Sequence, residues 1–131
     1  MPLPVLPRPT SDQFTITLGE PSEALGARRN FGLPPAMAAV AMFSRTLALE
    51  VKRQGIRVNV VTPSIVEGAR LRKRIAAGGF GGKLFEKAAA AAHLGVATER
   101  DVAEMIGFLA SDRAARVTGQ VISINGGISA G

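Results

Sequence analysis

The strongest constraint on the fold is residues 33–64, LPPAMAAVAMFSRTLALEVKRQGIRVNVVTPS. Apolar residues recur at close to helical spacing from about 35 to 53, and Pro34 and Pro35 suit the start of a helix. Gly55 suits its end. Residues 56–62 then form a β-branched run that stops at Pro63, as a buried strand does. A long helix that leads directly into a buried strand predicts an α/β fold with a parallel sheet.

The expected helix is apolar on more than one side. Val40, Phe43, Leu47 and Val51 form one stripe, and much of the remaining surface is also apolar. A helix of this kind must be covered on more than one side. We therefore expect one side to pack on the sheet and another to meet a second protein chain.

The rest of the chain continues the alternation of strands and helices. We expect a strand at 14–18, a loop at 19–30, helices at 65–77 and 83–94, a helix at 98–111, and a last strand at 117–124. Thr98 and Asp101 resemble a capping box at the start of the 98–111 helix. The glycine-rich joint at 78–82 (GGFGG) reads as a mobile hinge. This order predicts about three parallel strands flanked by helices, in one domain at 13–131 that follows a Pro-rich arm at 1–12.

Composition excludes several kinds of site. The 131 residues contain no cysteine and one histidine, so neither a disulfide nor a thiolate metal site is available. We expect no metal site, and His93 reads as a residue near a helix end. No apolar run approaches the roughly 20 residues that span a bilayer, and the proline-rich start does not resemble a signal peptide. These features fit a cytoplasmic protein without a membrane span.

The chain is basic, with a formal net charge of +6. The densest cluster is Arg70, Arg72, Lys73 and Arg74. Such a cluster can attract nucleic acid or anionic ligands, but it is also typical of a solvated helix face. The chain has no tryptophan or tyrosine to stack on bases and no nucleic-acid-binding motif, which argues against nucleic acid as a partner.

From residue 14 onward the sequence resembles the C-terminal half of a short-chain dehydrogenase/reductase. Three segments carry the resemblance: SRTLALEVKRQGIRVNVVTPS, TERDVAEMIGFLASDRAARVTGQ and VISINGG. The resemblance implies a truncated Rossmann-like fold. It also implies that the 35–53 helix, the last helix and the last strand correspond to surfaces through which this family assembles into oligomers.

The family's catalytic set has no counterpart here. The resemblance implies a tyrosine as general acid, a lysine four residues later and a serine about one loop earlier. Counting back from SRTLALE without gaps places Leu33, Met37 and Glu20 at these positions, and the chain contains no tyrosine. Neither leucine nor methionine can transfer a proton. Ser22, near the serine position, could donate a hydrogen bond or simply turn the backbone, and Glu20 with Glu67 could be proposed as an acid–base pair.

One ligand-facing element is partly retained. Residues 63–68 (PSIVEG) resemble the family's loop over the nicotinamide end of the cofactor, through Pro63, Ser64, Ile65 and Gly68. Ser64 replaces a glycine, and Gly68 stands where a threonine often contacts the carboxamide. The glycines at 78–82 cannot serve as the phosphate loop, because they follow a helix and a dinucleotide loop must follow a strand. We therefore expect no cofactor, unless a partner chain supplies the other half of an NAD(P) site.

Three functions remain open from the sequence. The first is a catalytically degenerate subunit that associates with itself or with a full-length reductase. The second is an enzyme repurposed to non-redox chemistry, with a small-molecule ligand bound under the 65–94 helices. The third is an NAD(P)-dependent oxidoreductase component whose site is completed by another chain.

Overall fold

The computed structural model describes residues 14–17 and 35–129, with side chains from residue 38 onward. The elements in chain order are β1 (Phe14–Thr17), α2 (Pro35–Val51), η1 (Lys52–Gln54), β2 (Val58–Pro63), α3 (Ala69–Ala76), α4 (Gly79–Ala91), α5 (Glu99–Ala110), η2 (Asp112–Ala114) and β3 (Val121–Ile124). The predicted arm at 1–12 and the predicted loop at 19–30 lie outside the described residues.

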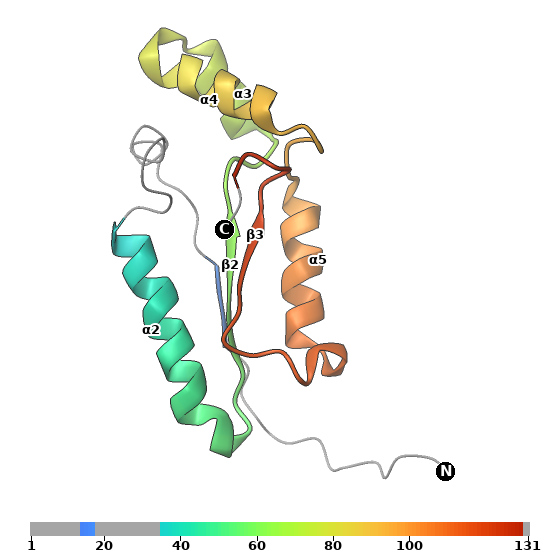
Figure 1. The fold of residues 1–131 in the computed structure, drawn as a ribbon. Helices are drawn as coiled ribbons and strands as arrows, with labels where there is room; N and C mark the ends of the chain where they lie inside the picture. Colours follow the sequence, from blue (N-terminus) through green and yellow to red (C-terminus); the bar gives the residue numbers. More distant parts are fainter. Residues whose placement is uncertain (1–13, 18–34, 130–131) are drawn as a thin grey trace.

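The sheet has the strand order β1-β2-β3, and both pairs are parallel. Ile16 lies opposite Val60, and Val61 lies opposite Ile122. The central strand β2 is buried along its whole length, as expected for a parallel strand covered on both faces. Helix α2 lies on one face of the sheet and α5 on the other (Figure 1). The predicted α/β architecture with parallel strands is therefore confirmed.

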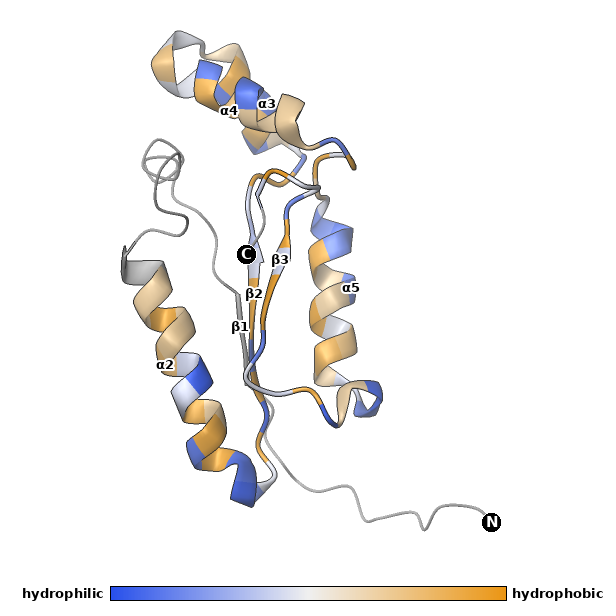
Figure 2. Ribbon diagram, viewed as in Figure 1, coloured by the Kyte–Doolittle hydropathy of each residue, from blue (hydrophilic) through white to orange (hydrophobic). Residues whose placement is uncertain are grey.

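The core between the sheet and α5 contains larger side chains than the contact between the sheet and α2. Val61, Leu109 and Ala114 are almost completely buried together. Half-buried apolar residues from α5, β3 and the loop between them surround this cluster, namely Val102, Met105, Ile106, Val117, Ile122 and Ile124. Apolar residues follow β2, β3 and the flanking helices (Figure 2). This cluster anchors α5 and the last strand to the centre of the sheet.

Helix α2 meets the other face of the sheet through small side chains. Ala41, Ser44 and Ala48 are buried and recur at helical spacing. The Ser44 hydroxyl donates to the Val40 carbonyl oxygen at 2.8 Å, so its burial leaves no unpaired donor. Phe43, one of the large apolar residues of the predicted stripe, is 63% exposed. Small residues hold the sheet-facing side because they allow the helix to lie close to the strands.

The end of α2 follows the prediction. The α-helix stops at Val51, a single 3-10 turn at Lys52–Gln54 continues it, and Gly55 follows with a φ of 76°. Glycine adopts this left-handed conformation without steric cost. The Gly55 N–H donates to the Lys52 carbonyl oxygen at 3.1 Å, which satisfies one of the free carbonyls at the helix end.

The predicted hinge at 78–82 is not a five-residue loop, because α4 already begins at Gly79. Gly78 and Gly79 have φ values of 69° and 70°, so these two glycines make a tight turn in a left-handed conformation. A Cβ on Gly82 would lie 3.1 Å from the Arg74 carbonyl oxygen, so this glycine allows α4 to approach α3 closely. The glycines are needed for a compact helix–turn–helix joint.

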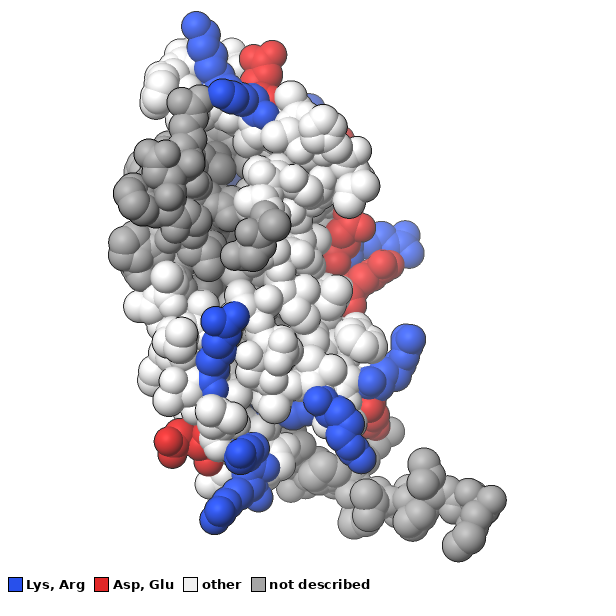
Figure 3. All heavy atoms as spheres, in the orientation of Figure 1, with Lys and Arg blue, Asp and Glu red and all other residues white. Residues whose placement is uncertain are grey.

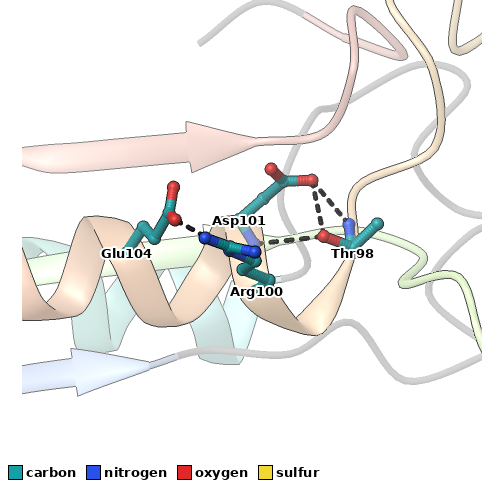
Figure 4. A network of polar contacts seen from close by, with 4 residues as sticks. All are labelled: Thr98, Arg100, Asp101 and Glu104. Carbon is teal, nitrogen blue, oxygen red and sulfur yellow. Dashed lines mark hydrogen bonds and ion pairs between the residues drawn. The ribbon is translucent and has the colours of Figure 1, made fainter.

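The predicted capping box at the start of α5 is confirmed. The Asp101 backbone N–H donates to the Thr98 hydroxyl oxygen at 3.1 Å, and the Thr98 N–H donates to the Asp101 carboxylate at 2.8 Å (Figure 4). Arg100 and Glu104, which lie one turn apart on α5, form an exposed ion pair at 3.0 Å. These contacts fix where α5 begins and therefore where the preceding loop must end.

Candidate functional site

The carboxyl ends of β2 and β3 lie side by side, with Pro63 opposite Ile124. In open parallel sheets, ligands bind in the loops that follow the carboxyl ends of the strands. Two such loops leave this edge, residues 63–68 after β2 and residues 125–129 after β3. The segment between α4 and α5 reaches the same edge. This cluster of three loops is the candidate functional site.

Backbone contacts hold the three loops together. The Glu67 N–H donates to the Ala97 carbonyl oxygen at 2.7 Å, next to a parallel bridge between Val66 and Ala97. The Leu94 N–H donates to the Gly126 carbonyl oxygen at 3.0 Å. The loop after β2 and the loop after β3 are thus both tied to the α4–α5 segment, which makes the edge a connected structure.

The resemblance singles out four residues of the remnant 63–68 loop, and the structure brings them to this edge. Pro63 is the last residue of β2 and is buried, and Ile65 is only 5% exposed. Ser64 is half-buried. Gly68 precedes α3 with extended backbone, and a Cβ there would meet nothing within 4 Å. The backbone therefore does not require glycine at 68, and a threonine would fit.

The turn after β3 has more defined side-chain and backbone contacts than the sequence indicated. The buried Asn125 side chain donates to the Ser129 carbonyl oxygen at 3.0 Å and accepts from the Gly127 N–H at 3.0 Å. A Cβ on Gly126 would overlap the Gly95 carbonyl oxygen. The two glycines after Asn125 indicated that another segment could approach the backbone closely here. Nothing in the sequence indicated that this segment would be Gly95.

The predicted catalytic positions all lie before residue 38 of the chain. Glu20, Ser22 and Leu33 lie outside the described residues, so neither the serine-like role of Ser22 nor a Glu20–Glu67 pair is tested. Met37 lies near the start of α2, before the side chains that the structure describes. Glu67 is exposed at the candidate edge. The assignment of Leu33, Met37 and Glu20 to the catalytic positions stays a prediction.

A second cluster of polar contacts lies at the amino end of β2, and it stabilises the fold. The buried Arg57 guanidinium donates to the carbonyl oxygens of Val117 and Ser111 at 3.2 and 3.3 Å. Burial lowers the pKa of Arg57, and the nearby Asp112 carboxylate partly opposes this effect. The Thr118 hydroxyl accepts from the Val58 N–H at 3.1 Å. These bonds attach the loop before β3 to the start of β2, which explains why β3 begins at Val121 and not at 117 as predicted.

The described residues contain no group of three or more histidine, cysteine or acidic side chains arranged to hold a metal ion. In the same part of the chain, no helix is long and apolar enough to cross a membrane. His93 is exposed just beyond the end of α4. The polar side chains in the described part of the edge include Ser64, Glu67, His93, Asn125 and Ser129.

These elements define a Rossmann-type half sheet with its ligand edge. A family model described as "Enoyl-(Acyl carrier protein) reductase" matches residues 25–129. The chain belongs to the short-chain dehydrogenase/reductase family. A crystal structure of a short-chain dehydrogenase/reductase from Burkholderia xenovorans superimposes with a TM-score of 0.69 at 27% identity, covering 90% of this chain and 45% of that one.

Curated relatives agree with this assignment. The 3-oxoacyl-[acyl-carrier-protein] reductase FabG of Escherichia coli is 35% identical over 113 residues, which cover 86% of this chain and 44% of that protein. The "Inactive 2-(S)-hydroxypropyl-CoM dehydrogenase 2" of Xanthobacter autotrophicus is 36% identical over 96 residues, covering 72% of this chain and 42% of the relative. The chain thus spans less than half the length of these relatives.

Proposed function

We propose that the chain is a non-catalytic member of the family that associates, through the outer face of α2, with a copy of itself or with a full-length reductase. The observation that carries this proposal is the exposure of large apolar side chains on that face. Met42, Phe43 and Leu49 are 57%, 63% and 64% exposed. We call these three residues the outer face of α2.

The outer face is exposed because of how α2 packs. The side of the helix that meets the sheet consists of Ala41, Ser44 and Ala48, so the bulky residues beside them are left outside. Ala48 packs against the backbone of Gly119. A Cβ placed on Gly119 would lie 3.5 Å from the Cβ of Ala48. Covering each large outer side chain would contribute on the order of 1 kcal/mol, since about half of its surface is still exposed. Exposed large apolar side chains on one side of a helix are typical of a protein–protein contact.

The residues expected at the catalytic positions support the non-catalytic part of the proposal. Leucine and methionine at 33 and 37 cannot donate or accept the proton that the reduction of a carbonyl requires. The chain has no tyrosine that could take over this role from elsewhere. A relative of similar identity carries the word "Inactive" in its name, so loss of activity is compatible with this fold. We keep a cytoplasmic location as a prediction.

A second candidate function is an NAD(P)-dependent component whose site is completed by another chain. In the described residues β1 pairs only with β2, so its other edge is open to a further strand. A reductase that supplied this strand could also supply the cofactor. The 63–68 loop would then cover the nicotinamide end, as the resemblance implies.

Calorimetric titration of the purified chain with NAD(H) and NADP(H) tests the non-catalytic proposal. The proposed non-catalytic subunit gives no heat of binding on its own, and no reductase activity. If the purified chain binds either cofactor tightly, the non-catalytic proposal is wrong. Native mass spectrometry of the chain isolated with its partners then tests association. A homo-oligomer or a complex with a longer reductase is expected, and a pure monomer would contradict the proposal.

A further inference from the structure

Helix α3 carries a basic face that neither the family resemblance nor the outer face of α2 explains. Arg70, Lys73 and Arg74 recur at spacings of three and four residues and so lie on one side of the helix. Leu71 is buried and holds the helix to the protein. Lysine and arginine side chains stand at the end of the molecule formed by α3 and α4 (Figure 3). We call Arg70, Lys73 and Arg74 the basic face of α3.

The basic face borders an open hollow of about 340 Å³, whose lining also includes Ala77. The hollow is open to solvent, and its lining residues all lie on α3 or directly after it. Charged side chains that meet at a hollow can contact one ligand together, whereas cations scattered over a flat surface cannot.

One cation of the basic face is held in place from α4. The Arg74 guanidinium lies over the Phe85 ring, 6.0 Å from its centroid. The turn at Gly78 and the contact of Gly82 with the Arg74 carbonyl oxygen keep the two helices together. The position of Arg74 is therefore partly fixed before any ligand arrives, which lowers the entropy cost of binding.

The three cations of the basic face form no ion pair with a carboxylate within the described residues. Helix α3 contains no acidic residue. In that part of the chain the recorded ion pair joins Arg100 and Glu104 on α5, and none involves the three cations. Like charges three and four residues apart on a helix repel one another. An anion bound between them would relieve this repulsion.

We propose that the basic face of α3 binds a small ligand that carries two or more linked phosphate groups. Arg70 and Arg74 lie about one helical turn apart, so each guanidinium can meet a different one of two linked phosphate groups. Two guanidinium groups offer paired N–H donors that match phosphate oxygens, and the ammonium group of Lys73 adds a third charge. This site is independent of the proposed association through α2, and it does not rely on the 63–68 loop.

The test is calorimetric titration of the full chain with inorganic pyrophosphate and tripolyphosphate. The double variant Arg70→Gln/Arg74→Gln is compared with Arg100→Gln/Arg116→Gln, which removes the same charge from exposed positions elsewhere. Far-UV circular dichroism confirms that both variants are folded. We expect the basic-face variant to bind at least about tenfold more weakly and the control to bind almost as well as the original chain. Raising the salt concentration should weaken binding.

Three results would overturn the proposal. The first is no measurable binding of either polyphosphate by the original chain. The second is an equal loss of affinity in both variants, because this would show that net charge alone is responsible. The third is tighter binding of a single-stranded oligonucleotide than of tripolyphosphate through the same arginines, which would make nucleic acid the ligand.

Discussion

The Asn59 side-chain amide donates a hydrogen bond to the Val117 carbonyl oxygen at 3.0 Å, joining the centre of the sheet to the loop before β3. The Asn59 amide oxygen also accepts from the Gln120 N–H at 3.2 Å, and the side chain is 1% exposed. A buried asparagine with both ends paired in this way fixes the loop in one arrangement. Asn59 therefore helps to hold the segment before β3 to β2.

Replacing Asn59 by leucine should destabilise the chain by about 3 kcal/mol. Leucine has the same branching at Cγ but is larger and cannot form hydrogen bonds, so the Gln120 N–H loses its acceptor and the Val117 carbonyl keeps only the Arg57 donor. Urea unfolding followed by circular dichroism measures the change in the free energy of unfolding. Gln120→Ala is the control, because the exposed Gln120 side chain should contribute little. Similar stabilities for the two variants would contradict this role of Asn59.

The capping box predicts a pH dependence. Two hydrogen bonds from Thr98 lower the pKa of Asp101 below its ordinary value of 3.8. The bond from the Thr98 backbone N–H has the larger effect, and the bond from its hydroxyl has the smaller one. A lowered carboxyl pKa means that the ionised form stabilises the folded chain. This contribution is complete above pH 3.8 and is lost as the pH falls through the lower folded-state value. In Asp101→Asn the contribution should be absent at every pH.

Urea unfolding at neutral pH and at successively lower pH values checks this prediction. The difference in stability between the original chain and Asp101→Asn should shrink as the pH falls. Glu99→Gln, in the same turn, is the control for simple loss of charge near a helix start. Thr98→Ala should cost about 1 kcal/mol at neutral pH, because it removes the N-cap. A pH-independent difference for Asp101→Asn would show that its ionisation is not involved.

The tight α3–α4 joint predicts different effects for two neighbouring glycines. In Gly82→Ala, the new Cβ would lie 3.1 and 3.2 Å from the carbonyl oxygens of Arg74 and Ile75. In Gly81→Ala, the new Cβ would meet nothing within 4 Å, and alanine should favour the helix. We expect Gly82→Ala to be about 1–2 kcal/mol less stable than Gly81→Ala. Equal melting behaviour would contradict the close packing of α4 on α3.

The sequence predicted the order of the elements because helix and strand periodicities are strong in residues 35–63 and 98–124. It failed at residues 78–82, where a run of glycines has the same local preference whether it forms a loop or a tight turn. Only the contact of Gly82 with α3 distinguishes a loop from a tight turn here. That contact joins two elements, so the local sequence around the glycines does not reveal it. For the same reason, the bulky stripe on α2 did not indicate that small residues would face the sheet.

The candidate site was predictable only in part. The 63–68 loop follows directly from the end of a strand, so its place at the carboxyl edge could be inferred from topology. The contacts of Gly95 with Gly126 and of Glu67 with Ala97 could not, because they depend on how three loops fold over one another. The assignment of Leu33, Met37 and Glu20 rests on an ungapped count along the sequence.

We propose that another chain covers the outer face of α2. Sedimentation velocity of the tagged chain, purified from the cells that make it, tests this association. We compare the original chain with Phe43→Glu, and use Phe80→Glu, at an exposed position on α4, as the matched control. We predict that the original chain and Phe80→Glu sediment in a complex, while folded Phe43→Glu sediments as a monomer of 13.6 kDa plus its tag. A monomeric original chain, or a Phe43→Glu variant that still assembles, would contradict it.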